Sequence, residues 1–214
     1  EVQYLGDNPT SPEAIALVVN NPELPWYDKK VRHALQMAIN REEIKEEYYD
    51  GQADMLPFPI NGSPGLAAAR LEIEDMPAAT QELYKYQPDK AKQLLAEAGF
   101  ASGFKARVMT QQQHVDLLSV IKQYWADIGV EMVIDVKEPA VWRSTLVAKT
   151  HPEMSMSVPG TGGVSAWLAN AFLVENWVNA PLAESPEMRK IQGIAETSNE
   201  DWDLIASAWQ EFLP

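Results

Sequence analysis

The strongest constraint on the fold of this chain is the regular placement of prolines and glycines across residues 88–149. Prolines stand where helices would begin and glycines where they would end, with hydrophobic residues at helical spacing between them. The predicted order is a helix at 88–98, a strand at 104–110, a helix at 114–128, a strand at 130–136 and a helix from 139 to about 149. Strands and helices that alternate through short connections indicate an α/β fold.

The flanking segments extend this pattern. An apolar run at 14–20 with three β-branched residues predicts a buried strand. Asp28 is placed to cap a long helix that continues to about residue 49, where Gly51 would end it. Residues 51–82 contain too many prolines and glycines for long regular structure. The remaining predicted elements are a strand at 154–158 and helices at 186–197 and 199–213.

The composition excludes several classes of partner. Acidic residues number 31 against 17 Lys and Arg, which gives a formal charge of −14. Nucleic-acid binding and docking on an anionic membrane both depend on basic side chains, so neither is expected. The absence of cysteine excludes disulfides, cysteine-bound zinc and thiol catalysis. The longest uncharged stretch, Met154–Val174, carries proline, glycine and hydroxyl residues, which indicates a loop-rich segment rather than a membrane span.

Catalytic and metal-binding patterns are weak. His33, His114 and His151 follow no ligand spacing, so no metal and no cofactor is expected. Ser119 and Lys122 match the S-x-x-K pattern of serine acylases, which leaves a serine hydrolase as an alternative function. The partner motifs of that chemistry are absent, and the pattern lies inside a predicted helix whose apolar residues serve the core. The interpretation as part of a structural helix is therefore favoured, and no enzyme activity is expected.

Three segments together resemble the family 5 extracellular solute-binding proteins, the peptide, nickel and oligosaccharide receptors of ABC importers. Asn20–Ile44 resembles the family's Pro-aromatic-Asp cap followed by V-R-x-A-L-x-x-A-I-[DN]-R-x-x-I, with Asn40-Arg41 where Asp-Arg is usual. Tyr86–Phe100 is similar to Y-[DN]-P-x-K-A-x-x-L-L-x-E-A-G-[FY], with Gln87 in place of the usual Asp or Asn. Ile121–Val136 resembles the family's helix ending in I-G-[IV] before an alternating strand.

This resemblance implies a fold and a role. It implies that residues 1–214 form one α/β lobe of the type II periplasmic-binding-protein kind, with a mixed sheet flanked by helices. The resemblance further implies that this is the C-terminal, second lobe of a bilobal receptor, and that the partner lobe is absent from the chain. A receptor of this family captures a small solute or peptide between its lobes and delivers it to an ABC permease. The implied location is periplasmic or extracellular, and the sequence leaves a lipid anchor open.

Four residues are our candidates for ligand contact. Trp167 and Asn170 lie in the uncharged, glycine-rich segment, where an aromatic ring beside small polar residues is typical of a pocket. Phe58 and Asn61 lie in the proline-rich loop of residues 55–64. Burial in the tertiary core is the alternative for each residue taken alone.

The identity of the ligand stays open between two classes. The family default is an oligopeptide, and its peptide-binding members usually hold the free amine with an Asp in the segment that matches 155–175. This chain has no acid from Met154 through Val174. An oligosaccharide, bound through aromatic stacking, is therefore the alternative. A protein-interaction module that uses the acidic C-terminal helices is a third hypothesis.

Overall fold

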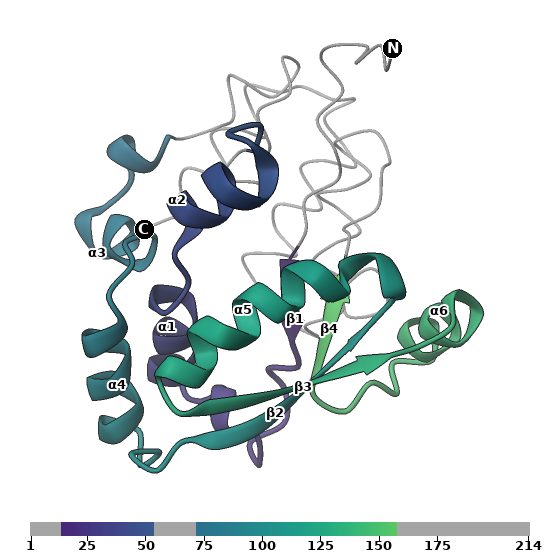
Figure 1. Ribbon diagram of the computed structural model, residues 1–214. Coiled ribbons are helices and arrows are strands. Elements are labelled where there is room, and N and C mark those ends of the chain that lie inside the picture. The colour runs from purple at the N-terminus through teal and green to yellow at the C-terminus, as the bar shows by residue number, and fades with distance from the viewer. Residues whose placement is uncertain (1–13, 54–71, 158–214) are drawn as a thin grey trace, which may run out of the picture.

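The computed structural model describes residues 14–53 and 72–157, and within them it shows a four-stranded mixed sheet (Figure 1). The strand order is β1-β4-β2-β3. The strands are β1 (Ala14–Leu17), β2 (Phe104–Thr110), β3 (Val130–Val136) and β4 (Met154–Ser157). β2 runs parallel to both β3 and β4, whereas β1 pairs antiparallel with β4. The α/β fold with a mixed sheet is thus confirmed.

Two crossover helices connect the parallel strands. α5 (Val115–Asp127) joins β2 to β3, and α6 (Pro139–Val147) joins β3 to β4. A 3₁₀ turn at Gln112–His114 precedes α5. The sequence predicted both helices to within two residues, because Gly129 marks the end of α5 and Pro139 the start of α6, whereas the 3₁₀ turn was not predicted.

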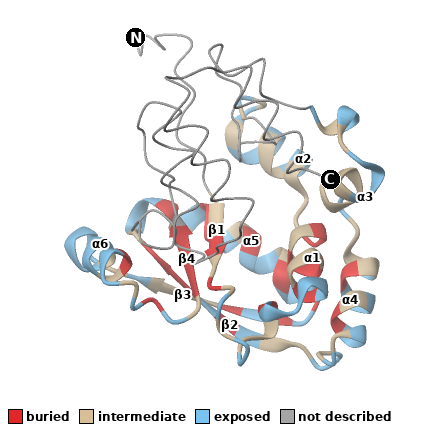
Figure 2. Cartoon of the chain, turned by 180° about the vertical axis from the view of Figure 1, so that it is seen from behind, coloured by how far each residue is buried: buried red, intermediate tan, exposed pale blue. Residues whose placement is uncertain are grey.

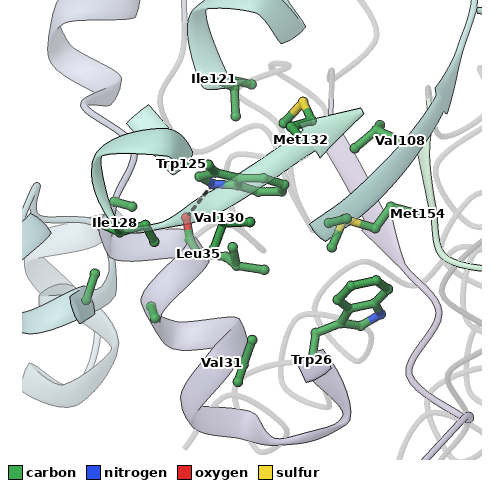
Figure 3. Packing of buried hydrophobic residues seen from close by; sticks show 14 of the residues in the cluster. Trp26, Val31, Leu35, Val108, Ile121, Trp125, Ile128, Val130, Met132 and Met154 are labelled. Carbon is green, nitrogen blue, oxygen red and sulfur yellow. Dashed lines mark hydrogen bonds between the residues drawn. The ribbon is translucent and has the colours of Figure 1, made fainter. Parts of the chain in front are cut away.

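The core lies on one face of the sheet, under α5 and two further helices, α1 (Lys29–Met37) and α4 (Pro88–Glu97). Figure 3 shows Trp125 of α5 between this sheet face and α1, with its indole nitrogen directed at the Leu35 carbonyl. Trp26 is also fully buried and donates its indole N–H to the Val18 carbonyl at 2.9 Å. Each of these two tryptophans buries a large apolar area without leaving its one polar group unpaired.

The first helix is shorter than the sequence predicts, and this is the clearest correction. Asp28 does cap it, since its carboxylate accepts the Lys30 N–H at 2.7 Å. The helix ends at Met37, however, and a short helix α2 (Arg41–Glu43) begins after a break and continues as a π-helical turn, Ile44–Tyr48. Asn40 caps α2 by accepting the Glu43 N–H. The predicted uninterrupted helix from 29 to 49 is therefore wrong.

Tertiary contacts explain why α1 stops there. The last carbonyls of a helix lack partners within the helix. Here the Leu35 carbonyl accepts the Trp125 indole N–H, the Gln36 carbonyl accepts the Arg41 guanidinium, and the Met37 carbonyl accepts the Gln87 backbone N–H. The partners come from α5, from α2 and from the start of α4, so apart from Asn40 the causes of the stop lie outside the neighbouring sequence.

The other described elements are short. They are 3₁₀ turns at Pro25–Tyr27 and Ile73–Asp75, and the helix α3 (Ala78–Leu83). The predicted helices at 186–197 and 199–213 lie outside the described residues.

The two faces of the sheet differ in character. Buried residues concentrate on the strands and on the inward sides of α1, α4 and α5, whereas α6 is largely exposed (Figure 2). On the α6 side a smaller cluster forms from Ala16, Met109 and Leu146, with Trp142 against it. Val136, at the last position of β3, is 44% exposed, although it follows the same alternation as the buried Val130 and Met132.

Two glycines bring the ends of the βαβ unit together. Gly103, just before β2, and Gly129, just before β3, both have positive φ angles, +74° and +88°. A Cβ atom on Gly103 would lie 1.8 Å from the Gly129 carbonyl oxygen. The backbones approach so closely that only glycine fits at position 103.

Candidate functional site

The four candidate ligand residues cannot be placed. Trp167, Asn170, Phe58 and Asn61 all lie outside the described residues. The described part of the chain does, however, fix where the segments that contain them begin.

The carboxyl ends of β2, β3 and β4 meet at one edge of the sheet, because the register makes these three strands parallel. Open α/β sheets bind ligands outside the carboxyl ends of their strands, where loops and helix N-termini gather. This edge, which we call the carboxyl edge, is defined by residues 111–114 after β2, residues 137–138 after β3, and Ser157 at the end of β4.

The uncharged segment leaves the sheet at the carboxyl edge. Ser157 is the last residue of β4, so Pro159, where the loop predicted to hold Trp167 and Asn170 begins, follows it by two positions. Ala14 at the start of β1 is paired with Ser157. The chain therefore enters β1 and leaves β4 side by side at this edge.

Polar side chains follow β2 at the carboxyl edge. Gln112 and Gln113 are exposed, and the Gln113 amide donates to the Gln111 side-chain oxygen at 2.8 Å. His114, considered in the sequence only as a metal ligand, is instead buried at the start of α5. Sequence reasoning missed the three glutamines, although a polar run directly after a predicted strand was a visible signal.

The segment that leads to the proline-rich loop is held by half-buried polar contacts. The Arg41 guanidinium lies 5.6 Å from the centre of the Tyr84 ring and also donates to the Gln36 carbonyl. Burial lowers the pKa of Arg41 and raises the pKa of Tyr84. An arginine guanidinium stays charged in proteins, and the raised pKa keeps the Tyr84 phenol neutral, so a cation lies over a neutral ring.

A second contact holds α2 against α5. Burial, and then a hydrogen bond to the Glu43 carboxylate, raise the pKa of Tyr124. The Asn40 amide donates to the same carboxylate at 2.9 Å. Glu43 thus joins the break between α1 and α2 to α5. Further along the chain, Asp50 has a positive φ of +50°, which is unusual for a residue other than glycine, and Gly51 follows it.

Ser119 lacks the surroundings of a nucleophile. It lies on the exposed side of α5, and its hydroxyl donates to the Val115 carbonyl one turn earlier at 2.7 Å. A serine nucleophile needs a base that accepts its proton. Here a backbone carbonyl takes that place, and Lys122 is exposed on the same helix. The geometry therefore gives no support to a hydrolase.

Residues 14–53 and 72–157 contain neither a metal-binding cluster nor a candidate membrane span. Within them, no group of three or more His, Cys, Asp or Glu side chains is arranged to hold a metal ion. None of the helices found there has the length and the apolar character to cross a bilayer.

Comparison with known proteins identifies the family. The model of the bacterial extracellular solute-binding proteins, family 5 (middle region), matches residues 2–179. This match covers most of the chain, and the chain belongs to that family. The fold and the three sequence motifs agree with this assignment.

Among curated relatives, the chain is similar to heme-binding protein A of Haemophilus influenzae, at 26% identity over 88% of this chain. It is also similar to the glutathione-binding protein GsiB of Salmonella typhimurium, at 28% identity over 74% of this chain. The alignments cover 32% and 31% of these two relatives, so the chain spans about a third of their length.

Solved structures show the same fold at low identity. A periplasmic oligopeptide-binding protein of Thermotoga maritima with bound mannohexaose matches with a TM-score of 0.74 at 18% identity, over 96% of this chain and 42% of its own. The murein tripeptide binding protein MppA of Escherichia coli matches with a TM-score of 0.73 at 19% identity, over 99% of this chain and 42% of its own. The fold is thus that of type II periplasmic binding proteins.

Proposed function

We propose that residues 1–214 form one ligand-binding lobe of a solute receptor that serves an ABC importer. The observation that carries the proposal is the family match over residues 2–179. The ligand would bind between the carboxyl edge of this lobe and the remainder of the receptor. Closure around the ligand would then create the surface that the permease recognises.

The topology supports the carboxyl edge as the ligand side. The uncharged segment departs from this edge, and the exposed Gln112 and Gln113 lie on it. Trp167 and Asn170 remain our first candidates, followed by Phe58 and Asn61. Amide and aromatic side chains together suit a ligand that offers hydrogen-bonding groups and flat faces, and they require no catalytic constellation.

A peptide is the proposed ligand class. GsiB is named for glutathione, a tripeptide, and MppA for a murein tripeptide. An oligosaccharide is the second candidate, because the segment 154–174 has no acid to hold a peptide ammonium and the Thermotoga maritima protein carries mannohexaose. The proposed role implies that the receptor works on the periplasmic or extracellular side of the cytoplasmic membrane.

A fluorescence titration tests the split site. A receptor that carries this chain together with its partner lobe is titrated with di- and tripeptides, glutathione and mannohexaose, with tryptophan emission as the readout. We expect one ligand class to change the emission at micromolar concentration, and the 214-residue chain alone to bind that ligand at least about 100-fold more weakly, as expected when half of the contacts are missing. Equal affinity of the isolated chain would contradict the proposal.

Substitutions at the carboxyl edge locate the site. In the same receptor, Gln112→Ala combined with Gln113→Ala should weaken binding by about tenfold through lost hydrogen bonds. The matched control is Lys105→Ala, an exposed residue near the opposite end of β2, which should leave affinity unchanged. An equal loss of affinity in the double alanine variant and in Lys105→Ala, or no loss in either, would show that the carboxyl edge is not part of the binding site.

A further inference from the structure

The sheet face on the α6 side carries charged side chains from β2 and β3. Lys105 is paired with Glu131 at 2.8 Å across the two strands, and both side chains are about two-thirds exposed (63% and 66%). Such a surface pair contributes little to stability. Arg107 lies two residues further along β2, and Asp135 four residues further along β3. Both are on the same face of the sheet, but their surroundings differ.

Here the sheet, α6 and the turn before β4 line an open pocket of about 490 Å³. This volume lies within the range of small-ligand sites. Its wall is part charged and part apolar, with Arg107, Asp135, Lys137, Glu153, Met109 and Val141 among the lining residues.

Two of the four charges in this pocket neutralise each other. Lys137 contacts Asp135 at 3.0 Å, and the Asp135 side chain is only 21% exposed. The Arg107 guanidinium lies 3.8 Å from the other Asp135 oxygen, which is beyond hydrogen-bond distance. Lys137 is therefore the direct partner of Asp135, and the donors of Arg107 remain available.

Glu153 is held in place without being neutralised. One of its oxygens accepts the Arg107 backbone N–H at 2.6 Å, at the point where the β2–β4 ladder ends. Among the described residues no Lys or Arg lies within ion-pair distance of it. The pocket thus presents a guanidinium that shares Asp135 with the closer Lys137, and a carboxylate with no Lys or Arg of the described residues paired to it.

We propose that this pocket binds a small zwitterion, an α-amino acid with an apolar side chain. The ligand carboxylate would accept from the Arg107 fork, whose planar geometry matches a carboxylate. The ligand ammonium would lie against Glu153, and the apolar side chain against Met109 and Val141. This site is on the α6 face of the lobe and does not depend on the proposed receptor function.

Titration of the 214-residue chain with L-leucine tests the proposal, by calorimetry and by amide chemical shifts in NMR. We expect saturable binding with a dissociation constant of about 1 mM or tighter, and shifts at residues 107, 135 and 153. N-acetyl-leucine, which lacks the ammonium, and leucinamide, which lacks the carboxylate, should each bind at least about tenfold more weakly.

Variants separate the two charges from general effects. Arg107→Gln and Glu153→Gln should each weaken leucine binding by about tenfold or more. Glu153→Gln keeps an oxygen acceptor for the Arg107 N–H, so the strand end is preserved. Lys105→Gln is the matched control on the same strand and face, and it should bind like the parent. Absence of leucine binding at about 10 mM, or equal binding by all three variants, would overturn the proposal.

Discussion

At the scale of single residues, polar groups with tertiary partners account for features that the local sequence does not reveal. Trp125 is buried as the helical spacing predicts, yet its indole N–H also occupies the Leu35 carbonyl at the end of α1. A residue that appears in the sequence only as a core position therefore also fixes a helix terminus.

Replacing Trp125 with phenylalanine tests this double role. Trp125→Phe keeps an aromatic ring but leaves the buried Leu35 carbonyl without its donor, which should cost about 1–3 kcal/mol beyond the loss of apolar contact. The control is Trp142→Phe, because the Trp142 indole nitrogen has no acceptor among the described residues. Urea unfolding curves should show the larger loss for position 125, and equal losses would contradict the assigned role of the hydrogen bond.

The two glycines with positive φ between α4 and β2, Gly99 and Gly103, offer a matched pair. Gly99 has φ +88° with no heavy atom within 4 Å of an added Cβ, whereas an added Cβ on Gly103 would collide with the Gly129 carbonyl oxygen. Gly99→Ala should cost about 1–2 kcal/mol from backbone strain alone. Gly103→Ala should cost more than about 3 kcal/mol, since the collision adds to the strain. Comparable melting temperatures for the two variants would contradict the close approach.

At the scale of elements, the break between α1 and α2 is the main departure from the sequence prediction. Elements whose ends are marked by proline or glycine within residues 88–149 were predicted nearly to the residue. The break at residues 38–40 was not, because Gln87, Arg41 and Trp125 supply the partners from elsewhere in the fold. Asn40, the local signal, was interpreted as part of a continuous helix.

Asn40→Ala tests whether α2 depends on its cap. The Asn40 side chain accepts the Glu43 N–H and donates to the Glu43 carboxylate, so its loss should cost about 1–2 kcal/mol. Asn40→Asp keeps the acceptor but places a second carboxylate against Glu43. It should be less stable than the parent at neutral pH and should recover when Glu43→Gln is added. The measurement is the unfolding temperature of Asn40→Ala, of Asn40→Asp and of Asn40→Asp combined with Glu43→Gln. If the double variant does not recover stability, repulsion between the two carboxylates is not the cause of the loss.

The contact between α1 and α4 should depend on pH. Hydrogen bonds from Lys30 and Gln93 lower the pKa of Glu97 below its usual value of 4.5. A lowered carboxyl pKa in the folded state means that the contribution of the contact to stability is present above that usual value and is lost as the pH falls through the folded-state pKa. Glu97→Gln should therefore lower the unfolding temperature slightly at pH 7 and not at low pH. A difference that persists in acid would contradict the ionic origin.

At the scale of the whole molecule, the described sheet determines at which edge the chain enters β1 and leaves β4, and our candidate ligand residues belong to segments beyond it. The parallel strands could be predicted from the alternation of elements. Their order could not, because β4 inserts between β1 and β2 through long-range pairing. The candidate residues Trp167, Asn170, Phe58 and Asn61 belong to segments without periodicity, for which a sequence offers chemistry but no position.

The strand order predicts a gradient of backbone protection. β2 is paired on both sides, with β3 and β4, over a register of seven residues on the β3 side. β1 has four paired residues and, among the described strands, only β4 as a neighbour. Amide hydrogen exchange followed by mass spectrometry should show β2 as the slowest segment and β1 as much faster. Equal protection of β1 and β2 would mean that the sheet opens only as a unit.

The pairing of Ala14 with Ser157 has a mechanical consequence. β1 and β4 are neighbouring strands, and the two connections of the chain, into β1 and out of β4, both lie at the carboxyl edge of the sheet. A torque applied to those connections is thus borne by a four-residue ladder, not by the helices that enclose the core. The β1–β4 ladder is accordingly the part of the described structure that a load applied through both connections reaches first.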